Sequence, residues 1–108
     1  MEKIEKTLKY TKLFNLYGTL LSSAQREILS DYFFADLSIS EISENRNVSR
    51  AAVEDALSKG MARLDSFEES LRMCEKKARI AEKAQELHDM IEDAEQLRVL
   101  DEIMGELD

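Results

Sequence analysis

The sequence predicts an all-α protein, with a helix-turn-helix domain followed by a long helical extension. Three observations lead to this fold class. Pro is absent from the 108 residues and Gly occurs only three times, so little interrupts long helices. Apolar side chains recur at steps of three and four along most of the chain. Between residues 38 and 60, two such helical patterns are separated by a short Asn-containing turn, which is typical of a helix-turn-helix.

A first helix is expected over residues 4–21, where bulky apolar residues share one face. These residues are Tyr10, Leu13, Phe14, Tyr17, Leu20 and Leu21. A basic ridge runs along the first turns, where lysines recur every three residues as Lys3, Lys6, Lys9 and Lys12. We interpret this ridge as a solvated face, because charge runs on helices usually are. The alternative is that it contacts phosphate groups.

Two capping boxes mark the starts of the second and third helices. In each, a Ser is followed three residues later by Gln or Glu, so that both side chains can satisfy free backbone N–H groups. The pairs are Ser22 with Gln25 and Ser38 with Glu41. The expected buried residues are Ile28, Leu29, Tyr32 and Phe33 on the second helix, and Ile39 and Ile42 on the third. Both helices are therefore amphipathic elements of one small core.

The turn and the fourth helix are predicted in the stretch NVSRAAVEDALSKG, residues 47–60. Asn47 suits the turn because Asn tolerates left-handed backbone. Val48 is expected to fill the core, and Ser49 to cap the fourth helix. Val53 and Leu57 are expected to point inward. Arg46 is unusual, since an apolar residue would normally close this turn.

The fourth helix shows no clear stop, because apolar steps of three and four continue past Gly60 to the end of the chain. A helix of this length cannot bury such a stripe against a small domain, so it must fold back as a hairpin or pair with another chain. We expect a homodimer formed through residues 57–107, with packing within one chain as the alternative. The predicted division is a helix-turn-helix domain at residues 1–63 and a helical extension at residues 64–108.

The formal net charge of -8 is concentrated in the tail. Residues 1–83 hold 14 basic and 14 acidic residues, whereas residues 84–108 hold Arg98 and nine acidic residues. Such a tail repels nucleic acid and anionic membranes, while the neutral body does not exclude a nucleic-acid partner. No apolar run approaches the roughly 20 residues of a membrane helix, and the N-terminus lacks an apolar signal region. We therefore expect a cytoplasmic protein that does not bind membranes.

The sequence offers no support for catalysis. His88 is the only histidine and Cys74 the only cysteine, so no zinc-binding cluster can form. Cys74 lies on the apolar stripe, where it is expected to pack. No Gly-rich phosphate loop is present. We therefore expect no enzyme activity, no cofactor, no metal and no small-molecule substrate.

The exposed side of the fourth helix is the candidate nucleic-acid interface. The candidate contacts are Ser49, Arg50, Lys59 and Arg63. Of these, Arg50 is the one side chain near the front of the helix that suits base edges or phosphates. Glu54 and Asp55 follow it and would repel phosphates. This face therefore predicts weak binding to duplexes.

Four motifs occur in order along the chain: L-F-x-x-Y-x-x-L-L, Q-x-x-x-L-x-x-Y-F, D-x-S-x-x-E-I and V-S-R-x-A-V. Together they resemble the YlxM-like family of small bacterial helix-turn-helix proteins over roughly residues 7–75. The resemblance implies a fold akin to region 4 of sigma factors, with a helical C-terminal extension. It also implies association with the signal recognition particle pathway. The motif positions carried over are Ser49, Arg50, Ala52 and Val53.

The chain departs from the family pattern G-V-S-R-Q-A-V-Y-D-N at four positions of the turn and fourth helix. These are Asn47, Ala51, Glu54 and Ala56. The last three changes remove polar or aromatic groups that could touch nucleic acid. Two functions are therefore expected. The first is a regulatory protein that binds DNA or the RNA of the signal recognition particle. The alternative is a protein-interaction adaptor, whose acidic tail attracts a basic protein such as the particle's GTPase subunit.

Overall fold

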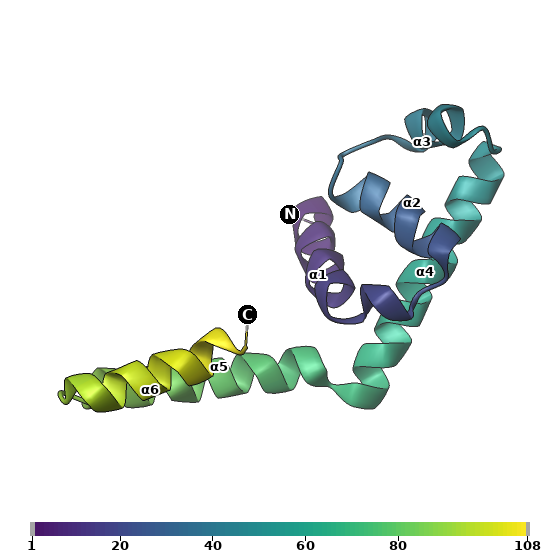
Figure 1. Cartoon of the computed structure of the whole chain (residues 1–108). Coiled ribbons are helices and arrows are strands. Elements are labelled where there is room, and N and C mark those ends of the chain that lie inside the picture. The colour runs from purple at the N-terminus through teal and green to yellow at the C-terminus, as the bar shows by residue number, and fades with distance from the viewer. Residues whose placement is uncertain (1, 108) are drawn as a thin grey trace. The chain divides into compact units, whose positions relative to one another are not determined.

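The structure is a computed structural model that describes residues 2–107, with side chains from residue 4 onward (Figure 1). The described residues form six α-helices, one short 3-10 helix and no strand, which confirms the all-α fold class. The helices are α1 (Glu2–Tyr17), α2 (Ser23–Phe33), α3 (Ile39–Arg46), α4 (Arg50–Leu71), α5 (Met73–Met90) and α6 (Ala94–Gly105), with η1 (Gly18–Leu20) between α1 and α2. They divide into two compact units, which we call the head (residues 2–71) and the hairpin (residues 72–107).

The long helix α4 organises the head, because α1, α2 and α3 all pack against it (Figure 1). The largest fully buried side chains come from three different helices: Leu29 of α2, Ile42 of α3, and Val53 and Leu64 of α4. Gly60 lies where α2 packs closely against α4. A Cβ atom at this position would stand 2.7 Å from Leu29 Cδ1. The core of the head therefore follows most of the length of α4.

Tyrosine–carboxylate hydrogen bonds join α1 to α4. The Tyr10 hydroxyl donates to Asp65 Oδ2 at 2.8 Å, and the Tyr17 hydroxyl donates to Glu68 Oε1 at 2.7 Å. Burial and the Asp65 carboxylate raise the pKa of Tyr10 above its ordinary value. Phe67 of α4 stacks at 5.8 Å from the Tyr17 ring. These contacts attach α1 to the second half of α4.

The predicted starts of α2, α3 and α4 are confirmed. Both capping boxes form: in α2 and α3 the Ser side chain accepts from the backbone three residues on, and the Gln or Glu side chain accepts from the Ser N–H. Asn47 is left-handed, with φ 54°, as the turn requires. Ser49 Oγ accepts the N–H of Ala52 at 3.0 Å, which caps α4.

Two residues predicted for the core are exposed instead. Val48 keeps 41% of its surface exposed, because its backbone rather than its side chain closes the turn: its N–H donates to Ser43 O, and its carbonyl accepts from Ser43 Oγ at 2.8 Å. Leu20 keeps 51% exposed. The first helix ends at Tyr17, and η1 turns more tightly than an α-helix, so Leu20 leaves the apolar face that its spacing predicted.

The head extends further along the chain than the sequence suggested. The expected division lay between residues 63 and 64, whereas the compact units divide between Leu71 and Arg72. Leu64 is fully buried and Phe67 stacks on Tyr17, so this part of α4 belongs to the head core. The helix ends because Arg72 adopts a left-handed conformation with φ 52°. No Gly or Pro marks this position, and the sequence indicated no stop.

The hairpin consists of α5 and α6, which fold back on each other. Asp93 starts α6, where its Oδ1 accepts the N–H of Glu95 at 2.9 Å. His88 Nε2 lies 3.1 Å from Asp101 Oδ1 and joins the two helices. Only Ala84 and Leu100 are buried hydrophobic residues among the described part of this unit. The extension is thus two helices rather than one uninterrupted helix, and its predicted role in dimerisation remains a prediction.

Candidate nucleic-acid interface

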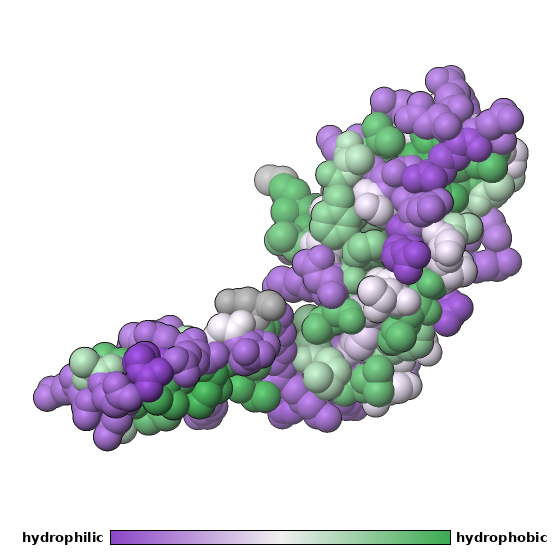
Figure 2. Space-filling view, in the orientation of Figure 1, coloured by the Kyte–Doolittle hydropathy of each residue, from purple (hydrophilic) through white to green (hydrophobic). Residues whose placement is uncertain are grey.

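The helix-turn-helix is formed by α3, the turn at residues 47–49, and α4. Ile42 of α3 and Val53 of α4 are fully buried where the two helices meet, so the angle between them is fixed by apolar packing. The outward side of the first turns of α4 is exposed, as predicted, at Arg50, Ala51 and Glu54. Hydrophilic side chains gather over the α3 end of the head in Figure 2.

Arg46 fastens the first helix of this motif to α2. Its guanidinium donates to both carboxylate oxygens of Asp31, at 2.6 and 3.1 Å, and to Glu27 Oε2 at 3.0 Å. The hydrogen bond with Asp31 raises the pKa of Arg46. An ion pair therefore replaces the apolar contact that usually closes this turn. Sequence reasoning missed these partners, although two acids four residues apart on the second helix were a usable signal.

Among the candidate nucleic-acid contacts, Arg50 is the side chain best placed to bind a phosphate or a base. It is exposed at the first position of α4, and within the described residues its side chain makes no hydrogen bond or ion pair. It lies beside the N-terminus of α4, where the helix dipole favours anions. The neighbouring candidate, Ser49, already uses its hydroxyl to cap the helix. Arg50 can therefore reach a phosphate or a base edge without breaking an existing contact.

The other two candidates are engaged within the chain. Lys59 Nζ pairs with Asp55 Oδ2 at 3.1 Å, one turn earlier on α4. Arg63 donates to the Leu20 carbonyl at 3.4 Å, and its guanidinium lies 5.5 Å from the centre of the Phe67 ring.

The structure does not bring the candidate contacts together on one surface. Nine residues span two and a half helical turns, so Arg50 and Lys59 lie on opposite sides of α4, about 14 Å apart along its axis. Glu54 lies one turn from Arg50, exposed on nearly the same side. The candidate surface at the start of α4 is therefore one cation beside an acid, rather than a continuous basic surface.

The lysine ridge of α1 is interrupted in its middle. Lys9 Nζ pairs with Asp65 Oδ1 at 3.1 Å, and this hydrogen bond raises the pKa of Lys9. Lys6 and Lys12 are exposed and carry no ion pair within the described residues. The side chain of Lys3 lies outside the described residues. The ridge thus offers two separated cations to a phosphate backbone.

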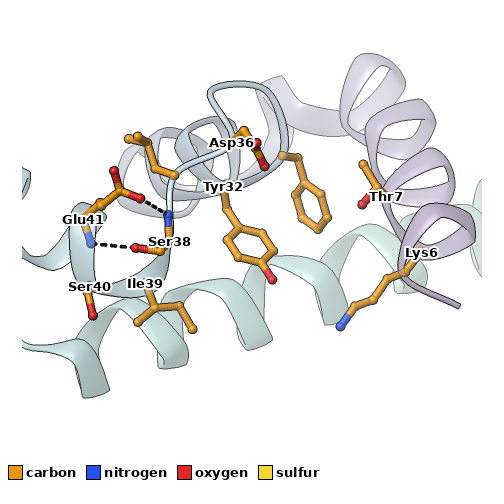
Figure 3. Close-up of a pocket in the computed structure, with 10 residues that line it drawn as sticks. Lys6, Thr7, Tyr32, Asp36, Ser38, Ile39, Ser40 and Glu41 are labelled. Atoms are coloured by element: carbon orange, nitrogen blue, oxygen red, sulfur yellow. Dashed lines mark hydrogen bonds between the residues drawn. The ribbon is translucent and has the colours of Figure 1, made fainter.

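A shallow cavity of about 450 Å³ opens beside the start of α3 (Figure 3). Lys6 borders it on α1, Tyr32 on α2, Asp36 on the loop before α3, and Glu41 on α3. Glu41 already accepts the N–H of Ser38 at 3.1 Å in the capping box. The cavity therefore has mixed charge and no set of groups that converge on one kind of ligand.

The part of the chain that the structure describes holds neither a metal-binding cluster nor a membrane-spanning helix. No group of His, Cys, Asp or Glu there could hold a metal ion. Cys74 is half-buried and forms no disulfide. No helix among residues 2–107 is long and apolar enough to cross a bilayer.

The comparisons with known proteins all point to one protein family. Residues 4–103 match the model of a family described as "Putative helix-turn-helix protein, YlxM / p13 like" (UPF0122). A UPF0122 protein of Fusobacterium nucleatum is 39% identical over 90 residues, which cover 83% of this chain and 84% of the relative. One from Halalkalibacterium halodurans is 35% identical over 108 residues, covering 97% and 99%. One from Malacoplasma penetrans is 47% identical over 60 residues, or 56% of each chain. The family match includes most of the hairpin. The sequence motifs, in contrast, showed a resemblance only over roughly residues 7–75.

Proposed function

Because the chain belongs to the YlxM/p13-like helix-turn-helix family, UPF0122, we propose that it is a non-enzymatic regulatory protein that binds nucleic acid through α3 and α4. The observation that carries this proposal is the position of Arg50. It is an exposed cation at the N-terminus of the second helix of the motif, and no acid within the described residues engages it. Helices in this position approach the nucleic acid with their N-terminal residues.

The expected binding is modest and sensitive to salt. Lys6, Lys12 and Arg50 are the cations of the head that we expect at phosphates, and each phosphate contact adds to the salt dependence. Glu54 and Asp55 oppose tight binding to a duplex. A single-stranded or structured RNA tolerates such a surface better than a duplex groove does, because its bases and phosphates can adjust to separated cations.

Binding can be measured by fluorescence anisotropy with a duplex DNA and with the RNA of the signal recognition particle, each over a series of salt concentrations. That RNA is chosen because the resemblance to YlxM-like proteins implies a place in the signal recognition particle pathway. We expect affinity to fall steeply with salt, and Arg50→Glu to weaken binding by about tenfold or more. The matched control is Arg26→Glu, the same charge reversal on α2. Binding that is absent, or that ignores both salt and Arg50→Glu, would contradict the proposal.

The acids on α4 favour a second candidate, a protein-interaction adaptor. Lys59 is neutralised by Asp55, and Glu54 stands beside Arg50. A basic protein partner would find acidic side chains both here and in residues 84–108. We expect a tagged chain to co-purify with a basic protein, such as the GTPase subunit of the particle, and to lose it when residues 84–108 are removed. Retention of the same partner by the truncated chain would exclude the role of the tail.

A further inference from the structure

The hairpin buries too little apolar surface to be stable by itself. It contains fewer than 40 residues, a size at which domains usually need disulfides, metals or association. Cys74 forms no disulfide, and no metal-binding group lies among the described residues. Ala84 and Leu100 are its only buried hydrophobic residues within the described chain.

An apolar strip remains exposed along the hairpin. Ile80 and Leu87 lie seven residues apart on α5 and keep 50% and 48% of their surface exposed. Val99 and Ile103 lie one turn apart on α6 and keep 44% and 54% exposed. Apolar side chains lie along one side of the hairpin in Figure 2. Residues seven apart lie almost in line on a helix, so this strip has the spacing of a helix-packing face.

Part of this strip forms a groove of about 340 Å³ between the two helices. Its apolar lining residues are Leu87, Ile91, Val99, Leu100 and Ile103. Glu95 and Gln96 border it. A groove of this kind accepts the apolar side chains of another helix.

The charges of α5 are separated into two halves. Residues 73–81 contain Lys76, Lys77 and Arg79 against Glu75, a net charge of +2. Residues 82–90 contain Glu82, Glu86 and Asp89 against Lys83, a net charge of -2 with His88 neutral. The one basic residue of α6, Arg98, is already held by Glu95 and Glu102 at 2.6 Å each. The groove therefore lies in acidic surroundings, and the complementary basic apolar helix is the first half of α5 itself.

We propose that the hairpin pairs with the hairpin of a second copy, with the two α5 helices antiparallel, to form a four-helix bundle. Ile80 of one copy packs against Leu87 of the other, on both sides of a twofold axis. In this arrangement the basic half of each α5 lies along the acidic half of its partner. A parallel arrangement would place like charges side by side, which costs free energy. The twofold arrangement also closes, so that both grooves are filled and none is left for a third copy.

The first test is the molar mass of the full chain, measured by light scattering across a range of concentrations. We expect twice the monomer mass at high micromolar concentration. Ile80→Glu and Leu87→Glu should each raise the dissociation constant by at least about tenfold, because each buries a charge in the apolar contact. The matched control is Ala78→Glu, which adds the same charge at an exposed site half a turn away on α5. Circular dichroism verifies that each variant keeps its helices.

Charge reversal tests the antiparallel order. Lys76→Glu with Arg79→Glu makes both halves of α5 acidic, and Glu86→Lys with Asp89→Lys makes both halves basic. We expect each double variant alone to be mainly monomeric, and an equimolar mixture to form heterodimers. A monomeric wild-type chain, full dimerisation of Ile80→Glu, or a mixture that stays monomeric would overturn the proposal. No nucleic acid is present in these experiments, so their outcome is independent of the binding proposed for Arg50.

Discussion

In the head, several polar contacts join residues that are far apart in the chain. Tyr10 bonds to Asp65, and Arg46 bonds to Asp31 on a neighbouring helix. In the hairpin, His88 and Asp101 form a pair between the helices, but Lys83 pairs with Glu86, and Arg98 pairs with acids three and four residues away. The buried side chains differ in the same way, because the head closes over fully buried Leu and Ile while the hairpin leaves its apolar strip in solvent.

The difference shows that equal helix content does not mean equal stability. Pairs three or four residues apart stabilise a helix by only a few tenths of a kcal/mol each, roughly 0.2–0.5. They specify no tertiary fold. Burial of apolar side chains between helices provides most of the stability of small helical domains. We therefore expect the head to fold by itself and the hairpin to depend on association.

Separation of the two units should give the largest effect. We expect a chain ending at Leu71 to unfold cooperatively with denaturant. A peptide of residues 72–108 should be weakly helical at low micromolar concentration and gain helix as it is concentrated, because its apolar strip needs a partner. Circular dichroism at 222 nm measures both. A hairpin peptide that unfolds cooperatively and independently of concentration would show that the hairpin, like the head, folds by itself.

Truncation of a buried side chain in the head and of an exposed one in the hairpin should give the next largest contrast. Leu29 is fully buried, so Leu29→Ala should lower the free energy of unfolding of the head by about 3 kcal/mol. Val99 is partly exposed on the hairpin, so Val99→Ala should change the head by less than about 0.5 kcal/mol. All three tyrosines lie in the head, and their fluorescence during urea titration reports this unit. Similar losses from both variants would mean that the two units unfold as one.

Gly→Ala substitution at Gly60 in the head and at Gly105 in the hairpin should change stability by a smaller amount. Gly→Ala in a helix usually stabilises by up to about 1 kcal/mol. At Gly60 the new Cβ would stand 2.7 Å from Leu29 Cδ1 and 3.3 Å from Cδ2, and Leu29 is fully buried. We expect Gly60→Ala to destabilise the head by about 1 kcal/mol net.

Gly105→Ala is the control, since nothing lies within 4 Å of a Cβ atom there. We expect it to leave the head unchanged and to be neutral or mildly stabilising for the hairpin. Urea titration of both variants provides the measurement. A gain in stability at Gly60 would show that α2 can move away from α4.

The two units should also respond to opposite ends of the pH scale, with the smallest effects. Burial and Asp65 raise the pKa of Tyr10 above 10.0, and the hydrogen bond to Asp65 raises that of Lys9 above 10.5. Both groups bind their protons more tightly in the folded head, so their contribution is complete below pH 10 and is lost as the pH rises. Arg98 lowers the pKa of Glu95 below 4.5, so its contribution to the hairpin is lost as the pH falls through that range.

Denaturant titrations of the chain ending at Leu71, at pH 8 and above pH 10, provide the measurement for the head. Tyr10→Phe should reduce the alkaline loss of stability. An unchanged pH dependence in that variant would assign the loss to other groups.

Local signals in the sequence predicted the starts of α2, α3 and α4. Each helix-capping side chain accepts a hydrogen bond from the backbone N–H three residues later, as seen at Ser22, Ser38 and Ser49. A short stretch of sequence therefore contains both partners. Val48 was predicted wrongly, because a left-handed Asn47 before it turns its side chain outward. The direction of a side chain next to such a turn depends on dihedral angles that spacing alone does not describe.

Contacts between distant residues were not predictable in the same way. Arg46 was recognised as unusual, but its partners lie 15 and 19 residues earlier. Arg63 donates to the Leu20 carbonyl, 43 residues away, a contact that no local pattern predicts. The end of α4 depends on Arg72, a residue type with no special tendency toward left-handed backbone. Such features arise from the packing of the whole head, which a single sequence does not reveal.

The ion pair of Arg46 sets the smallest portion of the head that could be grafted onto another protein. A graft that starts at Ser38 would contain both helices of the motif but would leave the Arg46 guanidinium without Asp31 and Glu27. The transplanted turn would then lack the ion pair that joins α3 to α2. A functional graft must therefore begin at Ser22, and designed exchanges at positions 27, 31 and 46 must be made together.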